Sequence, residues 1–99
     1  MGGIDMKGLR YVVDTDVIDL QENKRDEDIE FIIIIKKQEV KNALHQIRQF
    51  FESDEIYTDI LFYTYQNHIQ IIVKKDSYLT FVLGLFKWKL LKKIEWIEN

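Results

Sequence analysis

The stretch IEFIIIIKK, residues 29–37, decides the fold, because five consecutive large apolar side chains run from Phe31 to Ile35. Four of the five are isoleucines, whose branched Cβ atoms pack well on a pleated sheet and favour extended backbone. A strand that is apolar on both faces is typical of the middle of a sheet that is covered on both sides. Residues 29–37 are therefore predicted to form a central strand.

The next segment, residues 38–53, changes from the periodicity of a strand to that of a helix. Its large apolar residues recur four, three and four positions apart: Val40, Leu44, Ile47 and Phe51. This spacing places them on one stripe, with polar residues on the opposite side, and predicts an amphipathic helix of about four turns.

Two segments of different composition precede the central strand. Residues 9–20 carry Leu9, Tyr11 and Val13 at alternate positions and are predicted to form one strand. Residues 21–28 (QENKRDED) are polar throughout and are expected to form a solvated connection.

A β-hairpin is predicted after the first helix. Residues 56–65 are rich in Ile, Tyr, Phe and Thr, as strands are. Asn67, together with Gln66 or His68, can form the tight turn, because Asn tolerates the positive φ that short hairpins need. Residues 68–75 predict the returning strand. Its alternate apolar residues share one face: Ile69, Ile71 and Val73.

The C-terminal segment predicts a second helix. Asp76 and Ser77 are candidate N-cap residues, and apolar residues recur every three or four positions from Leu79 to Ile97. A shift of 38 residues also superimposes two copies of a strand, a double lysine and a helix. This repeat favours a fold in which both helices cover one face of a sheet.

These elements predict an α+β fold in a single domain, residues 1–99. We expect a two-layer sandwich, in which a mainly antiparallel sheet of four to five strands carries two helices on one face. The preferred order is ββαββα, with one long C-terminal helix. The alternative is a ferredoxin-like βαββαβ order plus an N-terminal strand, in which the last helix stops near Lys89 and residues 94–97 form a final strand. The N-terminal and final strands would then compete for the same neighbour.

Composition excludes several classes of protein. At 46% hydrophobic and 31% charged residues, the chain is not expected to be disordered. The absence of cysteine excludes disulfides, thiolate nucleophiles and iron–sulfur clusters. No basic segment precedes an apolar stretch at the N-terminus, and the longest uncharged apolar run, residues 78–86, is less than half a bilayer span. We therefore expect a cytoplasmic protein with no membrane span.

Patterns for catalysis or cofactor binding are not evident, so we expect a protein that is not an enzyme and uses no cofactor. His45 and His68 have no evident nucleophile beside them and are expected to be solvated. The glycines match neither of the two common phosphate-binding spacings. Asp14 and Asp16 could share Mg²⁺ or Ca²⁺, although a dedicated site needs more ligands. The simpler interpretation is the charged face of an edge strand.

Nucleic-acid binding is an alternative function. The candidate residues are paired strand-end lysines and a basic C-terminal segment: Lys36, Lys37, Lys74, Lys75, Lys87, Lys89, Lys92 and Lys93. Tyr63, Tyr65 and Trp88 could stack on bases. The isoelectric point of about 5.3 disfavours this function, since nucleic-acid-binding domains are usually basic.

The apolar excess points to a protein interface. Two helices cover one sheet face, so the second face would expose aliphatic and tyrosine side chains: Ile32, Ile34, Tyr63, Tyr65 and Ile72. Such a patch is unusual on a monomer, and a symmetric homodimer is the commonest way to cover it, unless residues 21–28 or the N-terminus fold over it. The sequence therefore favours a self-associating interaction or regulatory module. A small-molecule-sensing domain is a third possibility.

Overall fold

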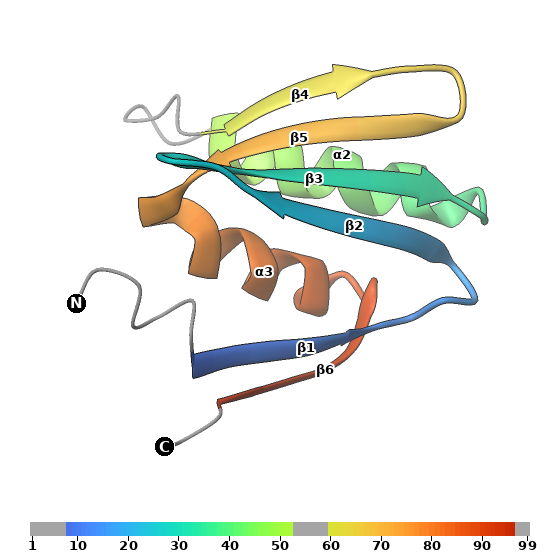
Figure 1. Cartoon of the computed structure of the whole chain (residues 1–99). Helices are drawn as coiled ribbons and strands as arrows, with labels where there is room; N and C mark the ends of the chain where they lie inside the picture. Colours follow the sequence, from blue (N-terminus) through green and yellow to red (C-terminus); the bar gives the residue numbers. More distant parts are fainter. Residues whose placement is uncertain (1–7, 53–59, 97–99) are drawn as a thin grey trace.

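Six antiparallel strands and two α-helices build the described part of the chain, residues 8–52 and 60–96, in the computed structural model (Figure 1). A single 3₁₀ turn, Lys75–Ser77, leads into the second helix. In chain order the elements are β1 (Leu9–Val13), β2 (Ile18–Lys24), β3 (Asp28–Ile35), α2 (Glu39–Glu52), β4 (Ile60–Thr64), β5 (His68–Lys74), α3 (Tyr78–Lys87) and β6 (Leu91–Trp96).

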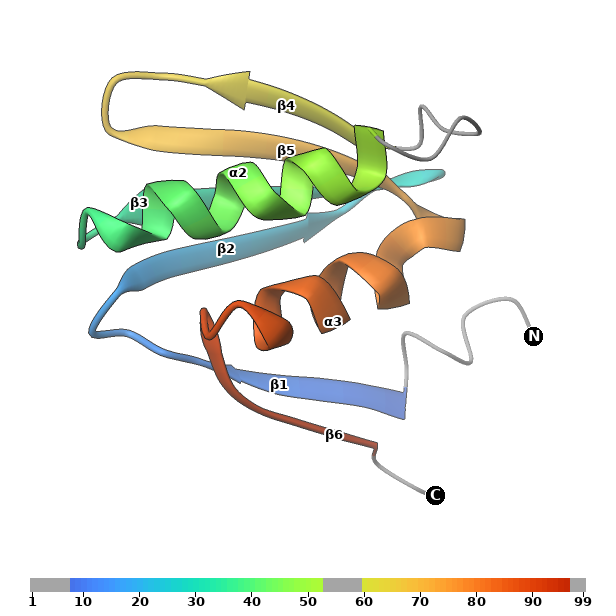
Figure 2. The same ribbon diagram turned by 180° about the vertical axis from the view of Figure 1, so that it is seen from behind.

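Four strands form the main sheet in the order β2-β3-β5-β4, and β1 and β6 form a separate antiparallel pair. The predicted central strand is confirmed, because β3 pairs with β2 on one side and with β5 on the other. Figure 2 shows the molecule from behind, and both helices lie on the side that faces the reader in this view. The ring of Phe81 in α3 lies 4.8 Å from that of Phe31 in β3, which places α3 against the sheet face that α2 also covers. The predicted α+β sandwich with both helices on one face is thus confirmed.

The core lies between this sheet face and the helices. Alternate residues of the two central strands enter it and are almost completely buried: Ile29, Phe31, Ile33, Ile71 and Val73. The first helix contributes the stripe that its spacing predicts, which includes Val40, Leu44 and Ile47. The second helix buries Phe81, Val82 and Leu85, whereas Leu83 and Phe86, which also recur at helical spacing, are exposed. At about 25 cal/mol per Å² of apolar surface removed from water, this interleaved layer supplies most of the drive to fold. Neither helix of the described residues is long and apolar enough to cross a lipid bilayer.

The hairpin is largely as predicted. Asn67 and Gln66 form the turn between β4 and β5, which the backbone N–H of Tyr65 closes by donating to the carbonyl oxygen of His68 at 2.9 Å. Of the predicted strand 56–65, residues 56–59 lie outside the described residues.

The prediction of one strand over residues 9–20 is wrong, because a turn divides it into β1 and β2. The carboxylate of Asp14 accepts a hydrogen bond from the backbone N–H of Asp16 at 3.1 Å, and its carbonyl oxygen accepts one from Ile18 at 3.2 Å. Asp is favoured in turns because its side chain can bond the backbone two residues on. Asp14 therefore stabilises a turn that also contains Asp16, and neither residue lies on a strand face.

The polar stretch 21–28 is also different from the prediction, since β2 continues through Lys24. Glu22 points toward the helices and accepts hydrogen bonds from the hydroxyl groups of Tyr11, at 2.5 Å, and Tyr78, at 3.0 Å. Burial, with the carboxylate of Glu22 beside them, raises the pKa of both tyrosines, so their hydroxyls stay protonated and donate. This cluster joins β1, β2 and α3 across the gap between the two sheets.

The preferred single helix over residues 78–97 is wrong at its end. The helix α3 stops at Lys87, and Lys89 takes a φ of 69°. The backbone N–H of Leu90 donates to Leu85 at 2.9 Å, and that of Lys89 donates to Phe86 at 3.0 Å. This pair of bonds is the Schellman C-cap, in which glycine usually occupies the left-handed position.

The ferredoxin-like alternative is right about the end of this helix but wrong about the last strand. The strand β6 (Leu91–Trp96) does not enter the main sheet but pairs with β1, placing Tyr11 opposite Ile94. Both elements lie below α3 in Figure 1. The competition for a place beside β3 is resolved in this way, because β2 takes that place.

Replacing Lys89 by glycine should stabilise the fold, because glycine adopts positive φ without the steric cost that a Cβ atom imposes. We expect Lys89→Gly to raise the free energy of unfolding by about 0.5–1 kcal/mol in urea denaturation. The matched control is Lys87→Gly, in the last turn of α3, which should lower it by a similar amount. Destabilisation by Lys89→Gly would contradict the assigned C-cap.

Candidate interaction surface

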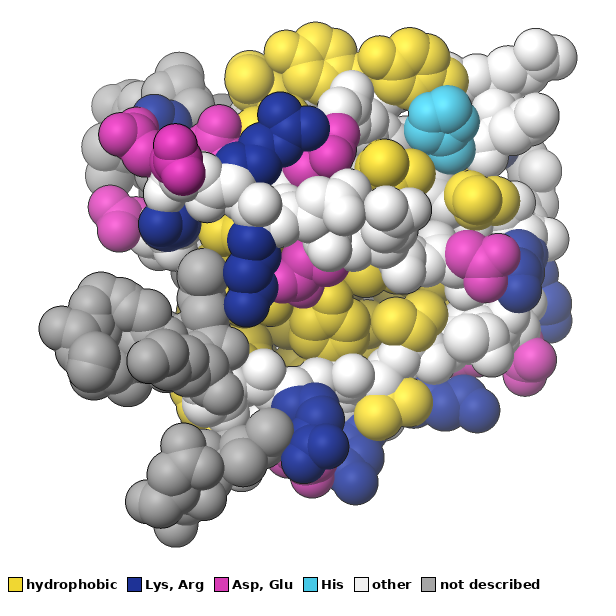
Figure 3. Space-filling view, in the orientation of Figure 1, with side chains coloured by type: hydrophobic (Ala, Val, Ile, Leu, Met, Phe, Trp, Pro, Cys, Tyr) yellow, Lys and Arg dark blue, Asp and Glu magenta, His cyan; other side chains and the backbone are white. Residues whose placement is uncertain are grey.

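The face of the main sheet that the helices leave uncovered, here called the open face, is the candidate site. The pairing registers place three residues of β2, β3 and β5 and two of β4 on it in matching rows, and Tyr65, directly after β4, continues the last row opposite His68. From β2 to β4 these are Asp19, Gln21 and Asn23; Ile34, Ile32 and Glu30; His68, Gln70 and Ile72; and Tyr65, Tyr63 and Leu61. Figure 3 views the molecule from this side.

All five residues predicted for the interface lie on the open face. Ile34, Tyr63 and Tyr65 are between 45% and 51% exposed, while Ile32 and Ile72 are half-buried. The prediction missed Leu61, which is 50% exposed. The alternation along β4, which pairs Leu61 with Tyr63 two residues later, is the signal that could have found it. Residues 21–28 do not fold over this face, since they form the end of β2, the turn after it and the first residue of β3.

The apolar residues gather toward β4. Leu61, Tyr63, Tyr65 and Ile72 form what we call the β4 patch, and Figure 3 shows large hydrophobic side chains along this edge. Gln70 and His68 separate the patch from Ile32 and Ile34 on β3, while β2 contributes only polar residues. The imidazole of His68 stacks on the ring of Tyr65, with 4.8 Å between ring centroids. The open face therefore has an apolar half toward β4 and a half toward β2 that is mainly polar but includes Ile32 and Ile34.

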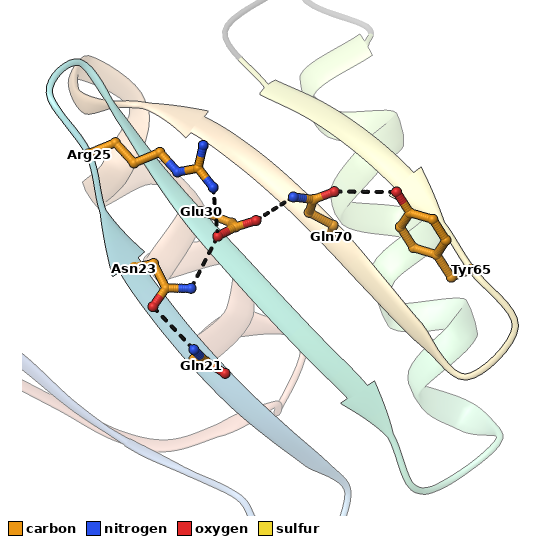
Figure 4. Close-up of polar contacts among 6 residues, drawn as sticks. All are labelled: Gln21, Asn23, Arg25, Glu30, Tyr65 and Gln70. Atoms are coloured by element: carbon orange, nitrogen blue, oxygen red, sulfur yellow. Dashed lines mark hydrogen bonds and ion pairs between the residues drawn. The ribbon is translucent and has the colours of Figure 1, made fainter.

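A buried carboxylate lies at the boundary between these halves. Glu30 is only 6% exposed, and its oxygens accept hydrogen bonds from the side chains of Gln70, Asn23 at 3.1 Å and Arg25 at 3.0 Å (Figure 4). The hydroxyl of Tyr65 reaches the amide oxygen of Gln70 at 3.5 Å, which extends the network to β4. The hydrogen bond from Gln70, followed by those from Asn23 and Arg25, lowers the pKa of Glu30. The carboxylate is thus fully engaged in binding its neighbours.

The hydrogen-bond network around Glu30 was not predicted from the sequence. The only signal for it is one acidic residue inside the apolar run 29–35, and the partners come from two other segments of the chain, residues 23–25 and Gln70. Its effect is to bury a charge at low cost, since every donor that surrounds the carboxylate compensates for lost hydration.

The candidate metal residues do not form a site. Asp14 and Asp16 lie in the turn between β1 and β2, where the carboxylate of Asp14 already accepts a backbone hydrogen bond. In the described part of the chain, no three His, Asp or Glu side chains come close enough to hold a metal ion together.

The lysines proposed for nucleic-acid binding do not come together. Because β3 and β5 are antiparallel, Lys36 and Lys37 follow one end of the sheet, whereas Lys74 and Lys75 lie at the opposite end. Lys36 is engaged locally, donating to the carbonyl oxygen of Thr15 at 2.8 Å and pairing with Asp19 at 3.1 Å. The remaining candidates lie at the end of α3, in the turn after it, and on β6: Lys87, Lys89, Lys92 and Lys93.

Two concave surfaces lie away from the open face. A mainly apolar groove of about 620 Å³ runs between α2 and α3, lined by residues that include Ile47, Leu83 and Trp88. A smaller groove of about 300 Å³ lies between α2 and β4 and includes Phe62, His45 and Arg48. His45 is thus an exposed residue on the flank of α2 that faces β4.

Comparison with known proteins finds no matching family model, and neither a curated protein nor a solved structure shows significant similarity. The geometry of the open face and of these grooves is therefore the evidence from which a function can be proposed.

The stabilising effect of Glu30 should depend on pH. Its pKa is lowered in the folded chain from an ordinary value of 4.5, so its contribution is complete above that value and is lost as the pH falls through the lowered pKa. We expect Glu30→Gln to reduce the free energy of unfolding by about 1–3 kcal/mol at about pH 7, and the difference from wild type to shrink toward about pH 3.

The control for this measurement is Glu52→Gln, which removes an exposed ion pair with Arg48 at 2.9 Å. Exposed pairs of this kind contribute less than about 1 kcal/mol, so this variant should stay close to wild type at both pH values. Urea denaturation at each pH measures both variants. A deficit of Glu30→Gln that is the same at both pH values would show that its charge is not what stabilises the sheet.

Proposed function

We propose that this chain is a non-enzymatic interaction module that self-associates through its open face. The observation that carries the proposal is the exposure of Ile34, Leu61, Tyr63 and Tyr65, each close to half exposed on one sheet face. Complete burial of a large apolar side chain is worth about 1.5–3 kcal/mol, so covering this group yields a substantial free energy. Apolar surface gathered on one face is typical of protein interfaces.

The charges of the open face support a second copy as the partner. Arg25 neutralises Glu30 at 3.0 Å, and Lys36 neutralises Asp19 at 3.1 Å, each within the same chain. Two copies of this face can therefore meet across a two-fold axis without bringing uncompensated like charges together. Tyrosine suits such a surface because its ring supplies area while its hydroxyl keeps a polar contact.

The alternative functions remain predictions. The eight lysines lie on several sides of the described fold, so no specific observation favours nucleic-acid binding over self-association. The groove between the helices gives small-molecule sensing a concave surface, but its mainly apolar lining does not by itself define a ligand. A cytoplasmic location likewise stays part of the proposal.

Self-association can be tested by light scattering across a concentration series, where wild type should approach twice the chain mass of 12.0 kDa. Tyr63→Glu and Ile34→Glu place a charge in the proposed interface and should weaken the dimer at least about tenfold, or about 1.4 kcal/mol. Leu83→Glu is the matched control, since Leu83 is 48% exposed but lies on α3, away from the open face.

A wild-type mass of 12.0 kDa at every concentration would refute the proposal. Equal weakening by Leu83→Glu would instead assign the contact to the helices. Circular dichroism of each variant checks that the fold is retained, so that loss of the dimer is not a consequence of unfolding.

A further inference from the structure

The outer edge of β4 has the chemistry of a site for strand addition. β4 is last in the order β2-β3-β5-β4, and no strand of the described residues pairs with its outer side. Its sequence, ILFYT, contains no charge and no proline, and its register with β5 has no bulge. Charges, prolines and bulges are the usual means by which proteins prevent pairing at an edge, and β4 uses none of them. By contrast, β2 at the opposite edge carries Asp19, Glu22 and Lys24.

The hairpin register identifies which backbone groups are available. The N–H of Tyr65 bonds to His68, and hydrogen-bonded pairs alternate along an antiparallel ladder. Leu61 and Tyr63 therefore direct their backbone groups toward β5, while Phe62 and Thr64 direct theirs outward. An added strand would bond to the N–H and C=O groups of these two residues.

The groove beside β4 would receive one face of such a strand. Its lining includes the apolar residues Leu44, Phe62 and Ile69, and α2 lies along the side opposite β4. Side chains alternate across a strand, so every second residue of an added strand would point into this groove. The others would lie beside Leu61 and Tyr63 on the open face, where cross-strand apolar pairs are stabilising.

The wall of the groove is basic. Lys41, His45 and Arg48 lie four and three positions apart on the flank of α2, and the residues lining the groove include no acid. The guanidinium of Arg48 lies 5.5 Å from the ring centroid of Phe62 and also pairs with Glu52 at 2.9 Å. A glutamate side chain entering the groove would lay its methylene groups on the apolar residues of the lining and bring its carboxylate to this wall.

We infer that β4 and α2 form a binding site for an extended segment of another protein in which acidic and apolar residues alternate. The segment adds to the main sheet at Phe62 and Thr64, its acidic side chains facing Lys41 and Arg48 and its apolar side chains facing the open face. Backbone hydrogen bonds supply affinity, and the basic wall supplies selectivity. The backbone contacts and the basic wall of this site lie at the sheet edge and on the helix side, and the site meets the proposed self-association surface only beside Leu61 and Tyr63.

The test uses a ten-residue peptide that alternates valine and glutamate, acetylated and amidated at its ends, in an NMR titration of the full chain. The largest shifts should fall on the amides of Phe62 and Thr64, and hydrogen exchange of both amides should slow at least tenfold. The matching peptide with lysine in place of glutamate should bind at least tenfold more weakly. Equal binding of the two peptides, or shifts that fall elsewhere, would overturn the inference.

Two variants separate the backbone and charge contributions. Thr64→Pro removes an outward N–H without touching the ladder to β5, and Lys41→Glu reverses the charge of the basic wall on an exposed helix position. Each should weaken binding of the glutamate peptide at least tenfold, whereas the control Lys92→Glu on β6 should leave it unchanged. Unchanged binding to Lys41→Glu would overturn the inference even if Thr64→Pro fails to fold.

The same samples distinguish this inference from self-association. Without peptide, Lys41→Glu should associate like wild type in light scattering, and Tyr63→Glu should not. If raising the protein concentration alone protects the amides of Phe62 and Thr64, a second copy occupies the edge, and the inference is overturned while self-association stands. A monomeric chain that still binds the glutamate peptide would leave only the proposed function refuted.

Discussion

The pairing of β3 with β5 is the interaction on which the rest of the structure depends. Both strands carry apolar side chains on both faces, and a two-layer fold completely buries only those on the helix side. The helices cover the sheet face that includes Phe31 and Ile71, and the side chains on the opposite side of the sheet form the open face. The exposure of Ile34 thus follows from its place in the central strand, since the apolar run that builds the core also places side chains on the uncovered side of the sheet.

Much of this arrangement could be predicted because it depends on periodicity. The strands β3 and β5 and the helix α2 bury the residues that spacing alone selects, such as Ile33, Ile71 and Ile47. Periodicity left the end of α3 open between two alternatives, because apolar residues continue at helical spacing beyond it; the helix ends where the less favoured alternative placed it, since Lys89 adopts a positive φ that sequence patterns assign to glycine. The strand character of the segment around Glu22 could not be predicted for a related reason. The two tyrosines that donate hydrogen bonds to the Glu22 carboxylate are 11 and 56 residues away in the sequence.

The candidate site could likewise be predicted only in part from the sequence. Alternation along a strand places Ile32 and Tyr63 on one face, but it does not show that Gln70 lies between them. Only the register reveals that Asn23, Arg25 and Gln70 converge on Glu30. These hydrogen bonds compensate the buried charge of the Glu30 carboxylate within the chain, so that this part of the open face needs no partner. The exposed side chains of the apolar half, by contrast, are removed from water only when a partner covers them.

The outer edge of β4 and the open face are physically coupled, because they meet at Leu61 and Tyr63. A strand added at Phe62 and Thr64 would place its own apolar side chains in line with Leu61 and Tyr63 and would enlarge the β4 patch. The open face of the complex would then be more apolar than that of the free chain, and its self-association correspondingly stronger. By linkage, the associated chain would bind the segment more tightly by the same factor. The uncharged sequence of β4 makes this coupling possible, because its outer edge can pair with an added strand while its side chains on the open face take part in self-association.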